Sequence, residues 1–141
     1  MLCRLEDDNK YYVDELNLTL DMKNNSQSII ANNISDNSFV LDVGCGAGAL
    51  GKLLKQAKKC KVHGIDIDAK ALKIAEKYYD NVENISVSDI CSKDYIKFIN
   101  NNCKYDYIVF ADLLEHVLDP GQLLYDFNKK LKENGKILVS I

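Results

Sequence analysis

The stretch VLDVGCGAGALG, residues 40–51, constrains the fold of this chain more than any other feature of its sequence. An apolar run, FVLDV, leads into its glycines, and apolar residues then recur at helical spacing at Leu50, Leu53, Leu54 and Ala57. Glycine-rich turns between a strand and a helix let a ligand approach backbone N–H groups closely. The stretch therefore predicts a buried strand, a ligand-binding loop and a helix.

Strand-like and helix-like segments alternate from residue 39 to the end of the chain. Strands are predicted at residues 39–43, 61–66, 84–88, 105–112 and 136–141. Helices are predicted after the glycines, after a cap at Asp68, around residues 95–99, and from a cap at Asp119 to a stop at Gly135. The helix after Asp68 is predicted to carry one apolar face, formed by Ala71, Ile74, Ala75 and Tyr78. This alternation predicts an α/β fold, a three-layer Rossmann-like domain whose parallel sheet has the order 3-2-1-4-5.

Residues 1–38 differ from the rest because they are polar and rich in asparagine. One helix is predicted around residues 26–34, and Tyr11 and Tyr12 are interpreted as packing residues. We divide the chain into an N-terminal cap segment, residues 1–38, and a binding domain, residues 39–141. The chain shows no apolar signal segment and no run of about 18 apolar residues, which predicts a cytoplasmic protein with no membrane partner.

The charge distribution disfavours a nucleic acid as partner. The formal net charge is −3, and the lysines are scattered among acidic residues. A nucleic-acid surface needs clustered lysine and arginine. The five cysteines contain no CxxC pair, which is typical of free thiols in a reducing compartment. The sequence therefore favours a small-molecule or sugar partner.

Asp42, two residues before the first glycine, helps to choose the ligand of the loop. Gly44-x-Gly46-x-x-Ala49 also fits a dinucleotide fingerprint. A dinucleotide brings a doubly anionic pyrophosphate, and one like-charge contact at roughly 5 Å costs about 3 kcal/mol at an effective dielectric of 20. Asp66 and Asp89 follow the second and third predicted strands, so three carboxylates meet at one crevice. This pattern favours a cationic nucleoside, S-adenosylmethionine, over NAD.

Four pieces in this order, VLDVGCGAG, HGIDID, VSDI and YDYIVFADLLEHVLDP, resemble the class I S-adenosylmethionine-dependent methyltransferases over residues 39–141. The most similar branches are O-methyltransferases of the ubiquinone pathway and methyltransferase segments associated with bacterial glycosyltransferases. The resemblance implies that Asp42 lies near the ammonium group, that Asp66 binds the ribose, and that Asp89 holds the adenine edge. The full implied cofactor set is Asp42, Gly44, Cys45, Gly46, Gly48, Asp66, Ile67, Asp89, Ile90 and Ala111.

His116 lies where the acceptor approaches in that family, which makes it the candidate catalytic base. An alternative is that His116 only hydrogen-bonds the backbone ahead of the Asp119 cap. A second alternative is a divalent-metal site formed by Asp112, Glu115 and His116, as in metal-assisted RNA 2′-O-methyltransferases. The favoured reading keeps His116 as a base and assigns no metal.

The predicted function is methyl transfer to a small-molecule or sugar acceptor, at oxygen. The resemblance implies a sheet with two further strands, so we expect a truncated domain with weak or no turnover and an exposed edge strand that favours dimers. The alternatives are a non-catalytic S-adenosylmethionine-binding module, an RNA 2′-O-methyltransferase and, last, an NAD-dependent oxidoreductase.

Overall fold

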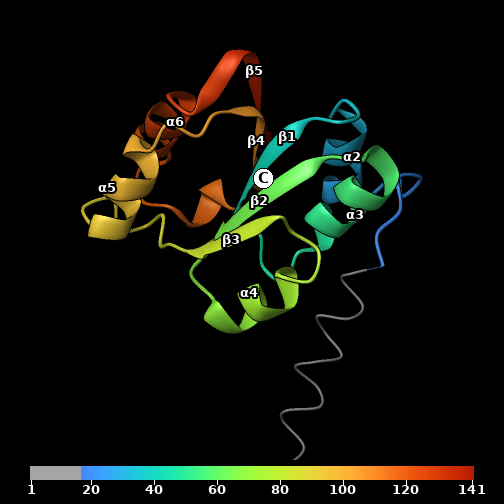
Figure 1. The fold of residues 1–141 in the computed structure, drawn as a ribbon, viewed down its shortest axis with the longest axis horizontal. Helices are drawn as coiled ribbons and strands as arrows, with labels where there is room; N and C mark the ends of the chain where they lie inside the picture. Colours follow the sequence, from blue (N-terminus) through green and yellow to red (C-terminus); the bar gives the residue numbers. More distant parts are fainter. Residues whose placement is uncertain (1–16) are drawn as a thin grey trace, which may run out of the picture.

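The computed structural model describes residues 17–141, in which one sheet is covered by helices on both faces (Figure 1). The five strands, all parallel, stand in the order β3-β2-β1-β4-β5. They span Phe39–Val43 (β1), Lys61–Asp66 (β2), Asn81–Asn84 (β3), Tyr105–Ala111 (β4) and Leu131–Ser140 (β5). The predicted fold class and strand order are confirmed.

Helices pack on the sheet in two groups, which Figure 1 shows on opposite sides. Helices α2 (Ser26–Asn32), α3 (Ala49–Lys58) and α4 (Ala69–Ala75) cover the face that carries Val40 and Val109. Helices α5 (Lys93–Asn100) and α6 (Pro120–Asn128) cover the other face, with Leu41 and Ile108. Neighbouring residues of β1 and β4 thus enter different cores, because side chains alternate across a strand. A short 3-10 helix, η1 (Leu114–His116), follows β4.

Two helices begin where the sequence predicts, because their caps satisfy backbone N–H groups. The Asp68 carboxylate accepts from the backbone N–H groups of Lys70 and Ala71, and that of Asp119 accepts from Gln122. The predicted apolar face of α4 is wrong at its end. The helix stops at Ala75, and the buried ring belongs to Tyr79, while Tyr78 is only half-buried.

The predicted third strand, residues 84–88, is displaced from the observed β3. Strand β3 pairs with β2, and Asn84 stands opposite Asp66, the last residue of β2. The Ile85 N–H still donates to the Asp66 carbonyl at 3.1 Å, and the chain then leaves the sheet. Ile85 is buried in the core beneath α5, so its apolar character reflects packing outside the strand.

The predicted helix stop at Gly135 is also wrong. Helix α6 ends at Asn128, and β5 begins at Leu131. Between them Lys130 is buried, and its Nζ donates to the Phe98 carbonyl at 2.8 Å and to Asn101 Oδ1 at 2.7 Å. The β4–β5 register then shifts between Tyr105 and Tyr107, so that Gly135 lies in an irregular part of β5. The Lys130 contacts join parts of the chain that are far apart in the sequence. The spacing of apolar residues within one helix therefore does not predict them.

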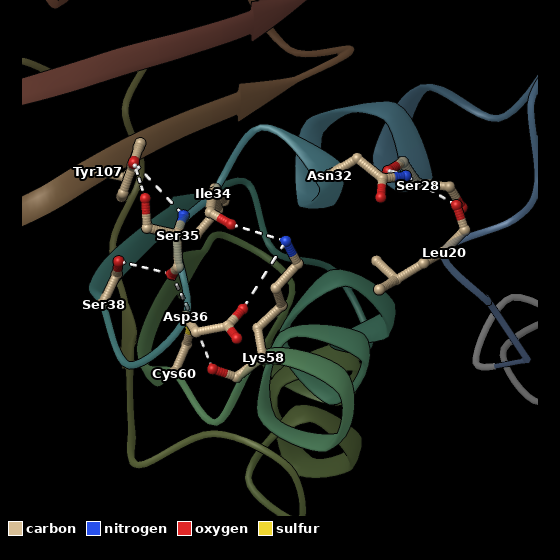
Figure 2. Close-up of polar contacts among 10 residues, drawn as sticks. All are labelled: Leu20, Ser28, Asn32, Ile34, Ser35, Asp36, Ser38, Lys58, Cys60 and Tyr107. Atoms are coloured by element: carbon tan, nitrogen blue, oxygen red, sulfur yellow. Dashed lines mark hydrogen bonds and ion pairs between the residues drawn. The ribbon is translucent and has the colours of Figure 1, made fainter.

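The connection from α2 to β1 is fastened to the body of the domain (Figure 2). Lys58 Nζ donates to the Ile34 carbonyl at 2.9 Å, and the Ser35 hydroxyl lies 3.0 Å from that of Tyr107. Ser38 Oγ donates to the Ser35 carbonyl at 2.7 Å. Ile30, Ala31 and Ile34 belong to the same core as β1. Residues 26–38 are therefore held against the sheet, while the division at residue 38 stays a prediction.

Tyr11 and Tyr12 lie outside the described residues. Within residues 17–141, no helix combines the length and the apolar character that crossing a bilayer requires.

Candidate functional site

A cavity of about 210 Å³ opens at the carboxyl ends of β1 and β2. Four predicted site residues contribute to its wall: Gly44, Asp66, Ile67 and His116. Sequence reasoning missed the rest of the wall, which consists of Ile65, Ile85, Ser86, Val87, Ser88, Leu113 and Val117. Most of the missed residues follow β3 or β4, where the chain leaves the sheet. Ligands of open α/β sheets bind outside the carboxyl ends of the strands, as this cavity would allow.

The glycine loop is tied to β2 by its backbone. The N–H groups of Gly44 and Cys45 both donate to the Ile65 carbonyl, at 2.8 and 3.1 Å. Gly46 has a φ of +54°, and a Cβ added there would meet no atom within 4 Å. Open space beside a left-handed glycine is a place where a ligand can approach the backbone. Gly46 is thus the residue of the loop at which the backbone is open to a ligand.

The Asp66 carboxylate is oriented by two backbone amides. Oδ2 accepts from the Gly46 N–H at 2.8 Å, and Oδ1 accepts from the Asp68 N–H at 2.8 Å. An ionised carboxylate has about four acceptor positions, so two remain for hydroxyl groups of a ligand. Ile67, the next residue, leaves 70 % of its surface exposed. A carboxylate held beside an exposed apolar side chain suits a ligand with hydroxyls on one part and a flat apolar ring on another.

Asp42 lies beneath the loop, away from the cavity wall. It is only 2 % exposed, and its Oδ2 accepts a hydrogen bond of 2.5 Å from the Tyr79 hydroxyl. Burial raises the pKa of Asp42 to about 7; the Tyr79 hydrogen bond lowers that pKa and the charge of Asp66 raises it. Burial likewise raises the pKa of the Cys45 thiol. These two predicted residues form a buried layer under the open part of the loop.

Gly48 also faces the interior. It is buried with a φ of +96°, and a Cβ there would lie 2.9 Å from the Tyr79 ring and 3.0 Å from Ala75 Cα. Its predicted contact with the cofactor is therefore restricted to its backbone. Ala111 is half-buried at the end of β4 and packs against the core that contains Tyr79.

Asp89 and Ile90 are exposed and lie outside the cavity wall, which reaches only as far as Ser88 along this segment. Their role in holding an adenine edge stays a prediction.

Asp112, directly after β4, has a positive φ of +52° and connects this strand to α2 and β5. Its carboxylate accepts from Ser26 Oγ at 2.9 Å and from Ser140 Oγ at 2.8 Å. In the part of the chain that the structure describes, no three His, Cys, Asp or Glu side chains are grouped as metal ligands. Asp112, Glu115 and His116 are thus not grouped as ligands here, and the assignment of no metal stays a prediction. His116 remains beside the cavity, exposed.

Comparisons with known proteins agree with this geometry. A family model described as a methyltransferase domain matches residues 13–141. The ubiquinone biosynthesis O-methyltransferase of Glaesserella parasuis is 35% identical over 104 residues, which cover 72% of this chain and 44% of that protein. Its counterpart in Hydrogenovibrio crunogenus is 31% identical over 106 residues, with 74% and 43% covered. The chain therefore spans less than half the length of these curated relatives.

Solved structures share the fold at lower identity. A complex of coclaurine N-methyltransferase with N-methylheliamine and S-adenosylhomocysteine (SAH) has a TM-score of 0.64 at 21% identity, covering 80% of this chain and 35% of that one. A TehB-like methyltransferase from Corynebacterium glutamicum has a TM-score of 0.63 at 19% identity, with 95% and 70% covered. The strand order, the glycine loop and the family match lead to one conclusion: the chain belongs to the class I S-adenosylmethionine-dependent methyltransferases.

Proposed function

We propose that this domain binds S-adenosylmethionine at the cavity beside Gly46 and Asp66 and serves methyl transfer to a hydroxyl group of a small-molecule or sugar acceptor. The observation that carries the proposal is the Asp66 carboxylate, fixed by two backbone amides next to an open glycine. Such a carboxylate is prepared to accept two vicinal hydroxyls without first having to be ordered.

The residues present fit this cofactor. Asp42 and Asp66 supply negative charge on adjoining strands, which matches a ligand with ammonium and sulfonium groups. Gly46 leaves room for the ligand beside the loop, and Ile67, Val87 and Leu113 offer apolar surface for a base. When bound, S-adenosylmethionine supplies an activated methyl group, so the protein's own task is to hold, orient and keep water from the reacting atoms.

A nicotinamide dinucleotide is the weaker candidate. Its pyrophosphate would meet Asp66, whose Oδ2 already occupies the Gly46 N–H. It would also lie above Asp42, and each like-charge contact costs about 3 kcal/mol at roughly 5 Å. The same two carboxylates that favour a cation therefore oppose an anion.

Calorimetric titration with S-adenosylmethionine, SAH and NAD tests the proposal. We expect the first two to bind and NAD to show no heat. At a ligand concentration of about 100 times its dissociation constant, the domain should gain roughly 2.7 kcal/mol of stability. Stabilisation by NAD alone would restore the oxidoreductase alternative.

An Asp66→Ala change should weaken binding of S-adenosylmethionine by at least about a hundredfold. The change removes two acceptor positions for ribose hydroxyls, and a hydrogen bond to a charged group contributes about 1.5–3 kcal/mol. It also frees the Gly46 N–H that now points at the carboxylate. The matched control is Asp36→Ala, an exposed carboxylate outside the cavity wall and outside the predicted cofactor set, which should leave affinity unchanged. Equal losses in both variants would contradict the role of Asp66.

His116 is proposed as the base that accepts the acceptor's hydroxyl proton. It lies on the cavity wall in η1, and a neutral imidazole is suited to this step near pH 7. A His116→Gln change should lower turnover by about 10²-fold or more and leave cofactor affinity unchanged, because general-base catalysis contributes roughly 10²–10⁴-fold. Single-turnover assays on hydroxylated small molecules measure this. Unchanged turnover would contradict the role of His116 as the base.

Oxygen is proposed as the methylated atom because the curated relatives bear the name O-methyltransferase. The cytoplasmic location and the absence of a nucleic-acid or membrane partner stay predictions, as does a dimer through the edge strand. The second candidate function is a module that binds the cofactor and transfers nothing. Cofactor binding without turnover, by both this chain and a longer form, would favour it.

A further inference from the structure

Tyr79 occupies a slot that three glycines leave open. A Cβ at Gly48 or Gly64 would lie 2.9 or 2.6 Å from the Tyr79 ring, and one at Gly51 would overlap it. The ring is buried, and its only polar atom sits between two partners. The Gly51 N–H donates to the hydroxyl at 3.0 Å, and the hydroxyl donates to Asp42 Oδ2 at 2.5 Å. The slot thus fixes where this hydroxyl lies.

The hydroxyl joins the start of α3 to the carboxylate under the loop. Gly51 lies in the first turn of α3, where backbone N–H groups have no partner inside the helix. Gly48, the residue before the helix, has no side chain to cap these groups. The Tyr79 oxygen accepts a hydrogen bond from that amide, and the Tyr79 hydroxyl donates a hydrogen bond to Asp42. The partial positive charge of the helix start is thereby relayed to the carboxylate.

We propose that Tyr79 is a positioning residue of the cofactor site, whose hydroxyl holds the Asp42 carboxylate oriented and ionised for the cationic amino group of the ligand. This inference rests on the proposed cofactor. Tyr79 contacts Asp42 and acts on the ligand only through it. The effect of Tyr79 on ligand affinity should therefore be limited to the part of that affinity that Asp42 contributes.

The titratable groups around Asp42 explain why the Tyr79 hydrogen bond matters. Asp66 on β2 and Cys45 in the loop face Asp42, together with Tyr79, which follows α4. The pKa of Asp42 is about 7 as the net result of burial, which raises it most, the Tyr79 hydrogen bond, which lowers it, and the charge of Asp66, which raises it. Loss of the hydroxyl therefore moves the pKa of Asp42 upward. A protonated Asp42 attracts a cation less, so affinity should fall as pH drops through that pKa.

The test compares Tyr79→Phe with Tyr78→Phe, which removes a hydroxyl from the neighbouring tyrosine. Phenylalanine fills the glycine slot, so the fold should be kept. The Asp42 side chain is titrated by carbon-13 NMR without ligand, and the SAH dissociation constant is measured between pH 6 and 9. In Tyr79→Phe we expect a midpoint about one pH unit higher than wild type. Affinity should be about tenfold weaker below pH 7 and converge near pH 9. Tyr78→Phe should match wild type.

Asp42→Asn removes the titrating carboxylate. Any pH dependence of SAH affinity that remains in this variant therefore comes from the ligand's own amino group. Adding Tyr79→Phe to Asp42→Asn should change affinity no further. A Tyr79→Phe midpoint equal to that of wild type, or the same loss of affinity at every pH and in the Asp42→Asn background, would overturn the inference. If Tyr79→Phe does not fold, a wild-type Asp42 that stays protonated up to pH 9 would overturn it as well, because the hydroxyl would then not keep the carboxylate ionised. The NMR titration needs no ligand, so a failure of SAH to bind wild type counts against the proposed function separately.

Discussion

Gly51→Ala should destabilise the domain by about 3 kcal/mol, although alanine is the better helix former. An added methyl group at residue 51 overlaps the buried Tyr79 ring. Overpacking costs about 1–3 kcal/mol, and displacing Tyr79 leaves the buried Asp42 carboxylate without its donor, which costs a further 1–3 kcal/mol or more. The gain in helix propensity returns only about 1 kcal/mol. Urea unfolding measures the difference.

Gly121→Ala is the matched control for this change. Gly121 also lies in the first turn of a helix, α6, and an added Cβ there would meet only Asp119 Oδ1 at 3.5 Å, an ordinary contact. We expect stability equal to wild type or up to about 1 kcal/mol higher. If both variants lose the same amount, the overlap with Tyr79 is not the cause.

Asp42→Asn should stabilise the domain by about 4 kcal/mol above pH 7 and hardly at all at pH 4. Burial raises the pKa of Asp42 from 3.8 to about 7. Between these values the folded state holds a proton that the unfolded chain releases, so wild-type stability falls as pH rises from about 4 to 7. The cost is complete above pH 7, and about three pKa units correspond to roughly 4 kcal/mol. Asparagine carries no such charge and therefore escapes this cost.

Urea unfolding of wild type and Asp42→Asn between pH 4 and 8 checks this pH dependence. Asp36→Asn, which alters an exposed aspartate, should change stability by less than about 0.5 kcal/mol. A stability difference that stays constant from pH 4 to 8 would contradict the burial argument. The same Asp42→Asn protein should lose affinity for the cofactor, because the charge that destabilises the fold is the one that attracts the ligand.

The sequence predicted those parts of the fold that local patterns determine. The strand, glycine loop and helix over residues 39–58 follow from spacing, and the caps at Asp68 and Asp119 follow from hydrogen-bonding chemistry. The strand order follows from the alternation of elements. The start of β5 was not predicted, because it depends on Lys130. This charged residue is buried through its contact with α5, and a sequence pattern assigns a lysine to the surface.

The candidate site was predicted where it lies on strand ends and missed where the chain leaves the sheet. Gly44, Asp66, Ile67 and His116 line one cavity, whereas Asp42 and Asp89, which were predicted to meet Asp66 there, do not line it. The wall from Ile85 to Ser88 was taken for a strand, because alternating polar and apolar residues look alike in both settings. The Tyr79–Asp42 contact joins residues 37 positions apart, and helical spacing pointed to Tyr78 in its place. Nothing local to the sequence indicates which of the two adjacent rings is buried.

The slot for Tyr79 changes how inactive relatives of this domain are to be recognised. Gly48, Gly51 and Gly64 are required by the ring, so a descendant that no longer binds a cofactor would still be selected to keep them for folding alone. Gly46 is different, since a side chain there would meet no atom of the protein within 4 Å, so that apart from its positive φ only a ligand requires the open space. Retention of a glycine-rich loop thus says little about activity in this lineage. Loss of Gly46 or Asp66, with the other glycines intact, is the signature that we expect of a domain that has become purely structural.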